Sequence, residues 1–168
     1  RVIPVTKDKA FIQVEYESGR KLAEEKFLDE KSADGSRIKN ISLSPKATLN
    51  CQVAEALEKA DYIVAGPGDL YSSIISISLV SGFKEAFAKS KAKIIFVMNL
   101  MTKSSQTPNY SSQDHLDDFL KFFGRKPDVV VLNTEPIPKD VVEYYKTESG
   151  DTPVIGEAMA DKVIKKPM

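Results

Sequence analysis

The sequence predicts an α/β protein with a Rossmann-like, three-layer fold, in which a parallel sheet is covered by helices on both sides and carries an antiparallel β-hairpin insertion. Two observations predict this fold. Short, almost wholly apolar runs at 62–66, 93–100 and 128–133 are each followed by a helical pattern, which is typical of parallel strands buried on both faces. In the first part of the chain, apolar and polar residues alternate instead, which indicates antiparallel strands with one wet face. We therefore expect a β-rich hairpin subdomain over 1–47 and an α/β half-domain over 48–168.

The amino-terminal part is expected to form strands joined by turns. VIPV at 2–5 looks like a strand, and 11–30 holds two alternating runs on either side of ESGR at 17–20, the pattern of a hairpin. SADGS at 32–36 has the composition of a loop, and 37–45 alternates again until its proline ends the strand.

Four helices are expected in the α/β part. The first, LNCQVAEALEKA at 49–60, has apolar residues at helical spacing and Asn50 as its N-cap. The others follow the apolar strands, at 72–90, 112–124 and 138–148. Strands and helices therefore alternate along this part of the chain.

Composition narrows the class of protein. The chain has 168 residues, the length of one ordinary domain, and its 24 lysines and arginines balance 24 aspartates and glutamates, so charge does not indicate a nucleic-acid partner. The single cysteine, Cys51, excludes an internal disulfide and fits a reducing cytoplasm. We expect Cys51 to be a small buried side chain rather than a nucleophile. No apolar run approaches the ~20 residues of a membrane span, and no signal peptide is visible, so we expect a cytoplasmic protein.

The first candidate for a ligand site is the loop GPGDLYSS, residues Gly66–Ser73. In an open parallel sheet, ligands bind beyond the carboxyl ends of the strands, where loops lead into helices. Gly66 and Gly68 allow a sharp turn and a close approach to a ligand. A serine at 72 or 73 is expected to cap the following helix, whose free N–H groups suit phosphate. Asp69 would repel a bare phosphate unless it binds a sugar hydroxyl or a metal ion. The alternative is a tight turn whose serines serve only as caps.

The second loop lies between the strand at 93–100 and the next helix. It is about a dozen residues long, a length that is often functional in compact domains. Its polar residues are Asn99 and Thr102 at the strand end, followed by Gln106, Asn109 and Tyr110. These side chains are the second group of candidates for a ligand site.

Three further positions are weighed next to these loops. We expect Ser112 to cap the helix that begins there, with Asp114 in its first turn. His115 is the only histidine, and we interpret a lone histidine in an amphipathic helix as a surface or packing residue. No second histidine or cysteine lies nearby, so no transition-metal site is expected. In the third loop, Asn133 and Glu135 follow a strand, and the Glu135 carboxylate either hydrogen-bonds a ribose or base or is solvated.

Three motifs carry a resemblance to a known family. GPGDLYSS is similar to a Gly-Pro-Gly-(Ser/Asp)-Leu-Tyr-Thr-Ser loop, and NLMT at 99–102 is similar to Asn-(Leu/Ile/Val)-Met-Thr. Tyr110, Asp114 and His115 match a tyrosine that precedes a helix with Asp-His. In this order the motifs resemble the YvcK-type gluconeogenesis factors, which belong with the CofD-like 2-phospho-L-lactate transferases.

The resemblance also implies how much of the family fold is present. Family members carry an earlier half that opens with a strand and a Gly-Gly-Thr-Gly loop, and VIPVT normally falls near the middle. The chain opens on Arg1 rather than methionine, so we expect a partial domain, the carboxyl-terminal half of such a protein. Pro108 and Asn109 depart from the family, which often has an acid and a glycine before the tyrosine.

The resemblance implies a regulatory protein that binds a UDP-sugar, such as UDP-N-acetylglucosamine. It implies a link to cell shape, cell-wall synthesis and growth on gluconeogenic carbon sources, with no established reaction and no required cofactor. Tyr110 would stack on or hydrogen-bond the nucleotide sugar, Asn99 and Thr102 would line the cleft, and Gly66–Ser73 would face the phosphates. The full set of expected ligand-binding residues is Gly66, Pro67, Gly68, Asp69, Leu70, Tyr71, Ser72, Ser73, Asn99, Met101, Thr102, Tyr110, Asp114 and His115.

Two alternatives stay open. A 2-phospho-L-lactate-type transferase would move a phospholactyl-type group onto a deazaflavin with magnesium (Mg²⁺), and Asp69 would then serve the metal or the substrate. Such transferases tend, however, to have a Gly-Pro-Ser-Asn type of loop where this chain has GPGD. The other alternative is a non-catalytic interaction module. No nucleic acid is expected as a partner, and a homo-oligomer is left open.

Overall fold

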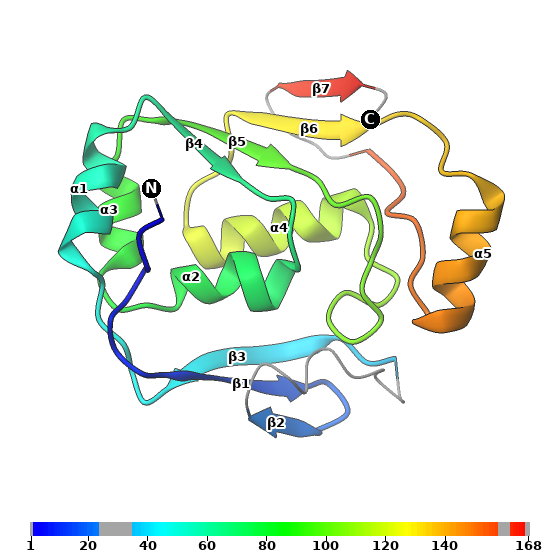
Figure 1. The fold of residues 1–168 in the computed structure, drawn as a ribbon, viewed down its shortest axis with the longest axis horizontal. Coiled ribbons are helices and arrows are strands. Elements are labelled where there is room, and N and C mark those ends of the chain that lie inside the picture. The colour runs from blue at the N-terminus through cyan, green and yellow to red at the C-terminus, as the bar shows by residue number, and fades with distance from the viewer. Residues whose placement is uncertain (1, 24–34, 158–161, 167–168) are drawn as a thin grey trace.

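The computed structural model describes residues 2–23, 35–157 and 162–166 (Figure 1). One element, η2, is a turn of π-helix that runs directly into α2. In chain order the elements are β1 (Phe11–Tyr16), β2 (Lys21–Ala23), β3 (Ile38–Ser44), α1 (Cys51–Lys59), β4 (Tyr62–Ala65), η2 (Leu70–Ile75), α2 (Ser76–Ser78), α3 (Phe83–Lys89), β5 (Lys93–Val97), α4 (Ser112–Phe123), β6 (Val129–Asn133), α5 (Lys139–Glu148) and β7 (Val163–Lys166).

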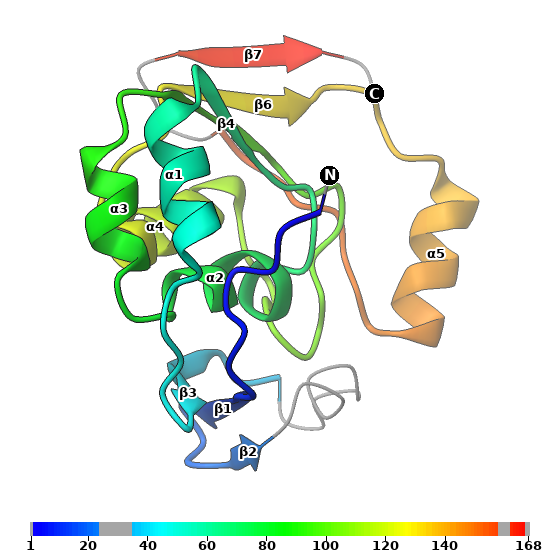
Figure 2. The ribbon, with the colours of Figure 1, turned by 60° about the vertical axis from the view of Figure 1, so that its left-hand side comes forward.

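The elements form three layers. Strands β4, β5, β6 and β7 lie side by side in that order as a parallel sheet, and β2, β1 and β3 form a smaller antiparallel sheet. Figures 1 and 2 show α2 and α4 between the two sheets, α1 and α3 together near the amino ends of the parallel strands, and α5 beyond their carboxyl ends. The fold is therefore α/β and Rossmann-like, with the antiparallel hairpin sheet packed on the central helices.

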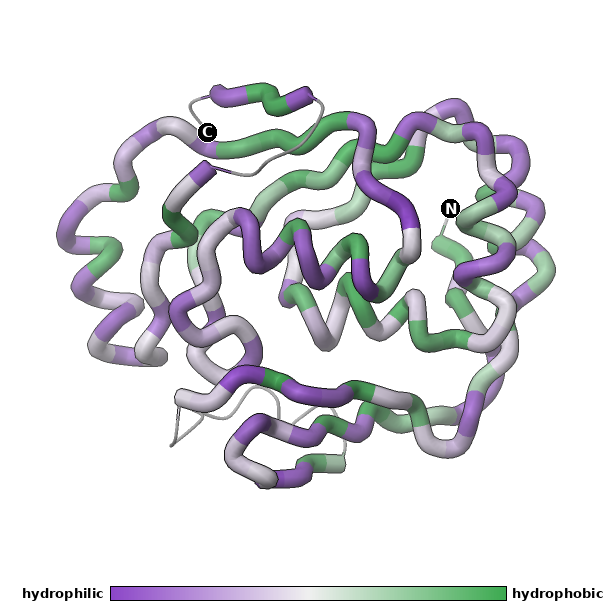
Figure 3. The backbone as a smooth tube through the Cα atoms, turned by 180° about the vertical axis from the view of Figure 1, so that it is seen from behind, coloured by the Kyte–Doolittle hydropathy of each residue, from purple (hydrophilic) through white to green (hydrophobic). Residues whose placement is uncertain are grey.

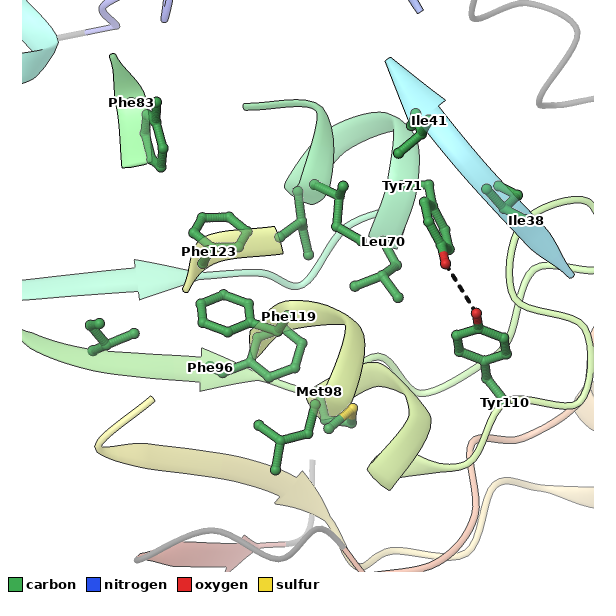
Figure 4. Close-up of a cluster of buried hydrophobic side chains, with 14 of the residues drawn as sticks. Ile38, Ile41, Leu70, Tyr71, Phe83, Phe96, Met98, Tyr110, Phe119 and Phe123 are labelled. Carbon is green, nitrogen blue, oxygen red and sulfur yellow. Dashed lines mark hydrogen bonds between the residues drawn. The ribbon is translucent and has the colours of Figure 1, made fainter. Parts of the chain in front are cut away.

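The hydrophobic core lies on both sides of the central helices. Phe96 and Val130 face α4 from the parallel sheet and are fully buried, and the ring of Phe96 stacks on Phe119 with centroids 4.9 Å apart. From the opposite side, β3 directs Ile38 and Ile41 toward the helical layer (Figure 4). One continuous core thus joins both sheets through the helices.

Most of the predicted elements are confirmed, with ends shifted by a few residues. The turn at 17–20 joins β1 to β2, with Val14 opposite Leu22, and the Asn50 side chain caps α1 by accepting a hydrogen bond from the N–H of Gln52 at 3.1 Å. Figure 3 shows the two sequence patterns on which these predictions rest. Strand β6 is hydrophobic along most of its length, whereas hydrophobic and hydrophilic residues alternate along α4. The parts of the predicted hairpin and loop that fall on 24–34 lie outside the described residues.

The expected strand at 2–5 is wrong. This segment is held instead by Asn50, whose side-chain nitrogen donates to the carbonyl of Pro4 at 3.0 Å and whose main-chain N–H donates to the carbonyl of Val5 at 2.9 Å. Pro4 has no N–H to contribute to a strand ladder, so an apolar run here docks on the start of a helix without pairing.

The helical segment expected over 72–90 is broken into shorter pieces. The structure has η2 and α2 up to Ser78, then a turn, and α3 begins at Phe83. Gly82 has a φ of 92°, a left-handed conformation that glycine adopts readily and that interrupts a helix. The periodicity continues across the break because both segments pack on the same core.

Two smaller differences lie at the ends of elements. The N-cap of α4 is Ser111, not Ser112, because Ser111 and Asp114 form a reciprocal capping box. Strand β7 is absent from the sequence-based prediction, and it pairs with β6 in the register Val130 to Val163. Its sequence, VIKK, is too short and too polar to stand out.

Two further expectations concern the burial of Cys51 and the presence of a membrane span. Cys51 is exposed, so the expectation of a buried side chain is wrong. It is the first residue of α1, where a helical pattern does not fix which way a side chain faces. Within the described ranges, no helix combines the length and the apolarity needed to cross a membrane.

Among the described residues, helices cover one face of the parallel sheet and not both as expected. Tyr62 and Val64 of β4 are 67% and 61% exposed, while Ile63 and Ala65, which point to the other face, pack against the core. In Figures 1 and 2, no described element lies over the face of the sheet opposite α2 and α4. A strand that is apolar on both sides indicates burial, but it does not say which part of a protein supplies the cover.

We predict that the same substitution has different costs on the two faces of this sheet. Val130→Ala, at a side chain that is 0% exposed, should lower the free energy of unfolding by about 2–3 kcal/mol, because it removes buried methyl groups and leaves a cavity. Val64→Ala on the open face should change it by less than about 0.5 kcal/mol. Urea unfolding of both variants measures the difference, and equal costs would contradict a one-sided core.

Candidate functional site

The candidate site is the edge of the parallel sheet where β4, β5 and β6 end. Three segments follow these strands, at 66–69, 98–110 and 133–137, and all three lie on the side of the molecule that faces α5 (Figure 1). This is the edge at which open parallel sheets bind ligands, and the polar loops identified from the sequence therefore meet there.

The turn after β4 is pressed against the end of β5. Gly66 has a φ of 83°, and a Cβ atom at this position would lie 2.6 Å from the carbonyl oxygen of Val97. The side-chain nitrogen of Asn99 donates to the carbonyl oxygen of Gly68 at 2.9 Å. Only glycine fits at position 66, and Asn99 fixes the turn over the strand end.

Two N–H groups in the first turn of η2, those of Tyr71 and Ser72, are already bonded. The side-chain oxygen of Gln106 accepts from the main-chain N–H groups of Tyr71, at 3.2 Å, and Ser72, at 3.1 Å. The side-chain nitrogen of Gln106 donates to the Ser72 hydroxyl at 3.2 Å. Two of the N–H groups expected to be free are therefore already used within the fold. The expectation of a serine cap is wrong, because the N-cap is Asp69 and makes no side-chain capping bond.

A lysine that the sequence argument did not single out lies beside this turn. The ammonium of Lys103 donates to the carboxylate of Asp69 at 2.6 Å, and both side chains are about one-third exposed or less. The positive charge offsets the carboxylate that seemed to oppose a phosphate at this loop. Ser73 is exposed next to Gly68, so a polar ligand can approach this side of the turn.

The second loop is fixed by the segment that follows α5. The N–H of Thr102 donates to the carbonyl of Thr152 at 2.7 Å, and their hydroxyl groups are 3.1 Å apart. Met101 pairs with Pro153, and the N–H of Ser104 donates to the carboxylate of Asp151 at 2.6 Å. Thr102 is buried in this pairing, which holds the loop in one conformation.

Tyr110 is buried within a hydrogen-bonded cluster. Its hydroxyl lies 3.1 Å from the hydroxyl of Tyr71 (Figure 4). Both hydroxyl groups donate to Asp118, that of Tyr110 at 2.9 Å and that of Tyr71 at 2.6 Å. Burial, followed by the Asp118 charge, raises the pKa of Tyr71, and burial is also the main cause that raises the pKa of Tyr110. The Arg37 guanidinium lies 4.6 Å from the centre of the Tyr110 ring, so this ring is packed on both its face and its hydroxyl.

Asp114 links α4 to Arg37, the residue directly before β3. One oxygen of its carboxylate accepts from the Arg37 guanidinium at 2.8 Å, and the other accepts from the N–H of Ser111 at 2.8 Å. Partial burial by itself would raise the pKa of Asp114, but the hydrogen bonds from Ser111 and Arg37 outweigh it and lower the pKa to about 2. The carboxylate is therefore ionised and structural over the physiological range.

His115 is fully buried and neutral. Its ring nitrogen Nδ1 donates to the carbonyl oxygen of Ser111 at 2.9 Å, and its ring meets Tyr110 edge-on. Burial lowers the pKa of His115. The interpretation of His115 as a packing residue thus agrees with its position in the structure.

The loop before Tyr110 has the backbone that a glycine would supply. Asn109 has a φ of 55°, which is left-handed, and asparagine tolerates this region better than other residues with a Cβ. The departure of Pro108 and Asn109 from the family sequence is therefore compatible with the sharp turn that a glycine permits.

A pocket of about 210 Å³ opens between the ends of β5 and β6. Its walls come from 98–100, 132–133, 135–137, 153–154 and Gly156, together with Ser112. Asn99 lines this pocket while it holds the carbonyl of Gly68. The turn after β4 and the pocket are therefore adjacent parts of one polar edge.

The fourteen sequence-predicted residues fall into two groups. At this edge, with surface that solvent or a ligand can reach, lie Gly66, Pro67, Gly68, Asp69, Ser73, Asn99 and Met101. Packed or hydrogen-bonded in the interior lie Leu70, Tyr71, Ser72, Thr102, Tyr110, Asp114 and His115. Sequence reasoning missed Lys103, Ser112 as a pocket residue, and Asp118. Only Lys103 had a local signal, because it directly follows NLMT.

Comparisons with known proteins match nearly the whole chain. A family model described as 2-phospho-L-lactate transferase CofD matches residues 1–167. A putative gluconeogenesis factor of Thermotoga maritima is 38% identical over 151 residues, which are 90% of this chain and 47% of that protein. The gluconeogenesis factor of Bacillus subtilis is 30% identical over 151 residues, 89% of this chain and 47% of that protein.

Solved structures give the same result for the fold. The crystal structure of a UPF0052 family member from Bacillus halodurans has a TM-score of 0.88 at 29% identity, over 98% of this chain and 54% of that chain. The chain spans about half the length of the curated relatives it matches.

The close approach of Gly66 leads to the first prediction for the site. Gly66→Ala should destabilise the protein by roughly 2–4 kcal/mol, because it combines a left-handed backbone with a Cβ pressed against the Val97 carbonyl. Gly68→Ala is the matched control: its Cβ would lie no closer than 3.6 Å to any neighbour, and it should cost less than about 1 kcal/mol. Thermal unfolding compares the two, and a tolerated Gly66→Ala would show that the turn is not held against β5.

Acid should weaken the contact between Arg37 and Asp114. Because the pKa of Asp114 is lowered from 3.8 to about 2, its stabilising effect is complete above about pH 4 and is lost as the pH falls from 4 to 2. Arg37→Met should lower the free energy of unfolding at pH 7 by about 1 kcal/mol, after allowance for solvent screening, and reduce this pH dependence. Lys39→Met, two residues further along the chain on β3, is the control. Urea unfolding measures the free energy of unfolding at each pH for the unaltered chain and the two variants. The same pH dependence in all three proteins would refute the contact between Arg37 and Asp114 as its cause.

Proposed function

The chain belongs to the CofD family, and on this premise we propose that it acts as a gluconeogenesis-factor-type regulatory protein of the cytoplasm that binds a UDP-sugar. The binding site is the edge formed by Gly66–Asp69, Asn99 and Lys103. The proposed ligand is of the UDP-N-acetylglucosamine type, no cofactor is needed, and the biological roles are in cell shape, cell-wall synthesis and central carbon metabolism. The names of the Thermotoga maritima and Bacillus subtilis relatives support the gluconeogenesis-factor role.

One observation carries the proposed binding site: Asn99 is shared between the turn and the pocket. Its side-chain nitrogen holds the Gly68 carbonyl at 2.9 Å, and its side-chain oxygen is buried and has no hydrogen-bond partner among the described residues. A ligand that lies along this edge can therefore contact the turn at one end and the pocket at the other. An elongated ligand with chemically different ends, such as a nucleotide sugar, suits this arrangement.

The charge at the turn suits a diphosphate better than the sequence indicated. The ammonium of Lys103 lies beside the turn and pairs with Asp69 at 2.6 Å, so an arriving phosphate meets a positive charge as well as a carboxylate. Asp69 can in turn accept a hydrogen bond from a ribose or sugar hydroxyl. Gly68 lets the backbone come close to such a ligand.

A transferase reaction is the alternative that the name of the matching family model favours. It would require Mg²⁺ close to Asp69. Mg²⁺ in phosphate-transfer sites is held by one or two carboxylates together with substrate oxygens, but Asp69 is paired with Lys103. Among the described residues, no group of three or more His, Cys, Asp and Glu side chains is placed to hold a metal ion. The residues described here do not fit a Mg²⁺ site, and we derive no reaction step through one.

Calorimetric titration tests the proposal directly. UDP-N-acetylglucosamine should bind the 168-residue chain, and Asn99→Ala should weaken binding by about tenfold or more, because it removes a ligand contact and releases the Gly68 turn. Asn40→Ala, at an exposed position on β3, is the control and should bind as the unaltered chain does.

The same experiment separates the two candidate functions. Binding of the UDP-sugar that Asn99→Ala leaves unchanged would refute this site. If no UDP-sugar binds while a deazaflavin changes its fluorescence on mixing, the transferase replaces the proposed function.

A further inference from the structure

The pocket between the ends of β5 and β6 contains polar groups that the fold itself does not use. The hydroxyl oxygen of Ser112 and the side-chain oxygen of Asn99 are buried, and within the described chain neither has a hydrogen-bond partner. Ser112 is 1% exposed and lines the pocket together with Asn99. A buried polar group without a partner costs about 1–3 kcal/mol, so two at one pocket are unfavourable unless something binds there.

The backbone around Ser112 also leaves space at this point. Gly156 has a φ of 94°, and a Cβ built on it would lie 3.7 Å from the hydroxyl oxygen of Ser112. The main-chain N–H of Ser112 already has a hydrogen-bond partner, because it donates to the carbonyl of Ile155 at 3.0 Å. The hydroxyl is therefore the group of Ser112 that is open to a ligand.

The other wall of the pocket adds acceptors and apolar surface. Glu135 is exposed at the rim, where an Asx-type turn with Asn133 holds its backbone through two hydrogen bonds of 2.8 Å. Pro136 and Pro153 contribute flat apolar surface to the lining. The pocket therefore combines a carboxylate and an amide oxygen with aliphatic walls.

The pocket lining determines which part of a nucleotide sugar fits there: the phosphate, the base or the sugar ring. A phosphate does not fit, because the described lining has no lysine or arginine and includes the Glu135 carboxylate. The lining also has no aromatic side chain on which a base would stack. Hydroxyl groups, in contrast, donate to carboxylate and amide oxygens, and the C–H faces of a sugar ring pack on aliphatic surface. A volume of about 210 Å³ corresponds to roughly seven water molecules, which suits one ring.

The geometry points to this pocket as the subsite for the hydroxylated sugar ring of the ligand, with the Ser112 hydroxyl, the Asn99 side-chain oxygen and the Glu135 carboxylate as its hydrogen-bond partners. This inference rests on the proposed function for the rest of the ligand, because the diphosphate then lies at the adjacent turn beside Lys103. It assigns Ser112 a role that neither its motif nor its expected place as a helix cap indicated.

The test compares UDP-N-acetylglucosamine with UDP on matched serine variants. Ser112→Ala should weaken UDP-N-acetylglucosamine binding by about 3- to 10-fold and leave UDP binding unchanged. Its thermal stability should not fall, because the lost hydroxyl has no partner in the fold. Ser78→Ala is the control: this serine is 3% exposed, but its hydroxyl donates to the carbonyl of Ile75 at 2.7 Å, so stability should fall and affinity should not. Glu135→Gln should also weaken the sugar nucleotide selectively.

The outcomes separate this inference from the proposed function. Equal loss of UDP and UDP-N-acetylglucosamine binding in Ser112→Ala, or no loss of either, would overturn the sugar subsite while nucleotide binding stood. If neither nucleotide binds the unaltered chain, free N-acetylglucosamine at millimolar concentration is the deciding probe. Shifts of the Ser112 amide and Asn99 side-chain NMR signals would then support the subsite alone, and their absence would overturn both.

Discussion

The candidate site depends on one close approach between two chain segments. The backbone of Gly66 lies so near the end of β5 that a Cβ there would be 2.6 Å from the Val97 carbonyl. Because this turn is fixed, the Gly68 carbonyl comes within hydrogen-bond distance of the Asn99 side chain. The helical turn that follows then places the N–H groups of Tyr71 and Ser72 on Gln106. A contact that requires glycine thus sets the positions of both polar loops at the carboxyl edge of the sheet.

The hydrogen-bond partners of each side chain distinguish residues that stabilise the edge from residues that are available to bind a ligand. Thr102 and Tyr110 resemble site residues in the sequence, but each makes a side-chain hydrogen bond within the fold and is buried. Replacing them would damage the framework, and a loss of binding would say little about ligand contact. The buried oxygens of Asn99 and Ser112 differ, because the described fold supplies them with no partner. A buried oxygen costs about 1–3 kcal/mol unless something hydrogen-bonds to it, so these two atoms are the better guide to the ligand.

The sequence predicted what local patterns determine and failed where distant contacts decide. Alternation located the strands of the hairpin, and apolar runs located β4, β5 and β6, because both patterns follow from how a strand places its side chains. The break at Gly82 left the helical periodicity intact, so the pattern could not show it. The exposed face of β4 depends on what covers the sheet, which no single strand encodes. Motifs placed Gly66 and Asn99 at the site, but Ser112 became a pocket residue only through the fold of 153–156 around it.

The distribution of charge along the edge would also set the direction of the elongated ligand that we propose. Lys103 is at the end next to the turn, whereas the pocket end carries the Glu135 carboxylate and, among its described lining, no cation. A phosphate beside Lys103 gains attraction that offsets its repulsion from Asp69, and a phosphate in the pocket would have repulsion alone. A sugar ring reverses this preference, since its hydroxyl groups can donate to Glu135 and Asn99. One orientation therefore satisfies both ends of the site, and the reversed orientation leaves a charge unpaired at one end and two buried oxygens unbonded at the other.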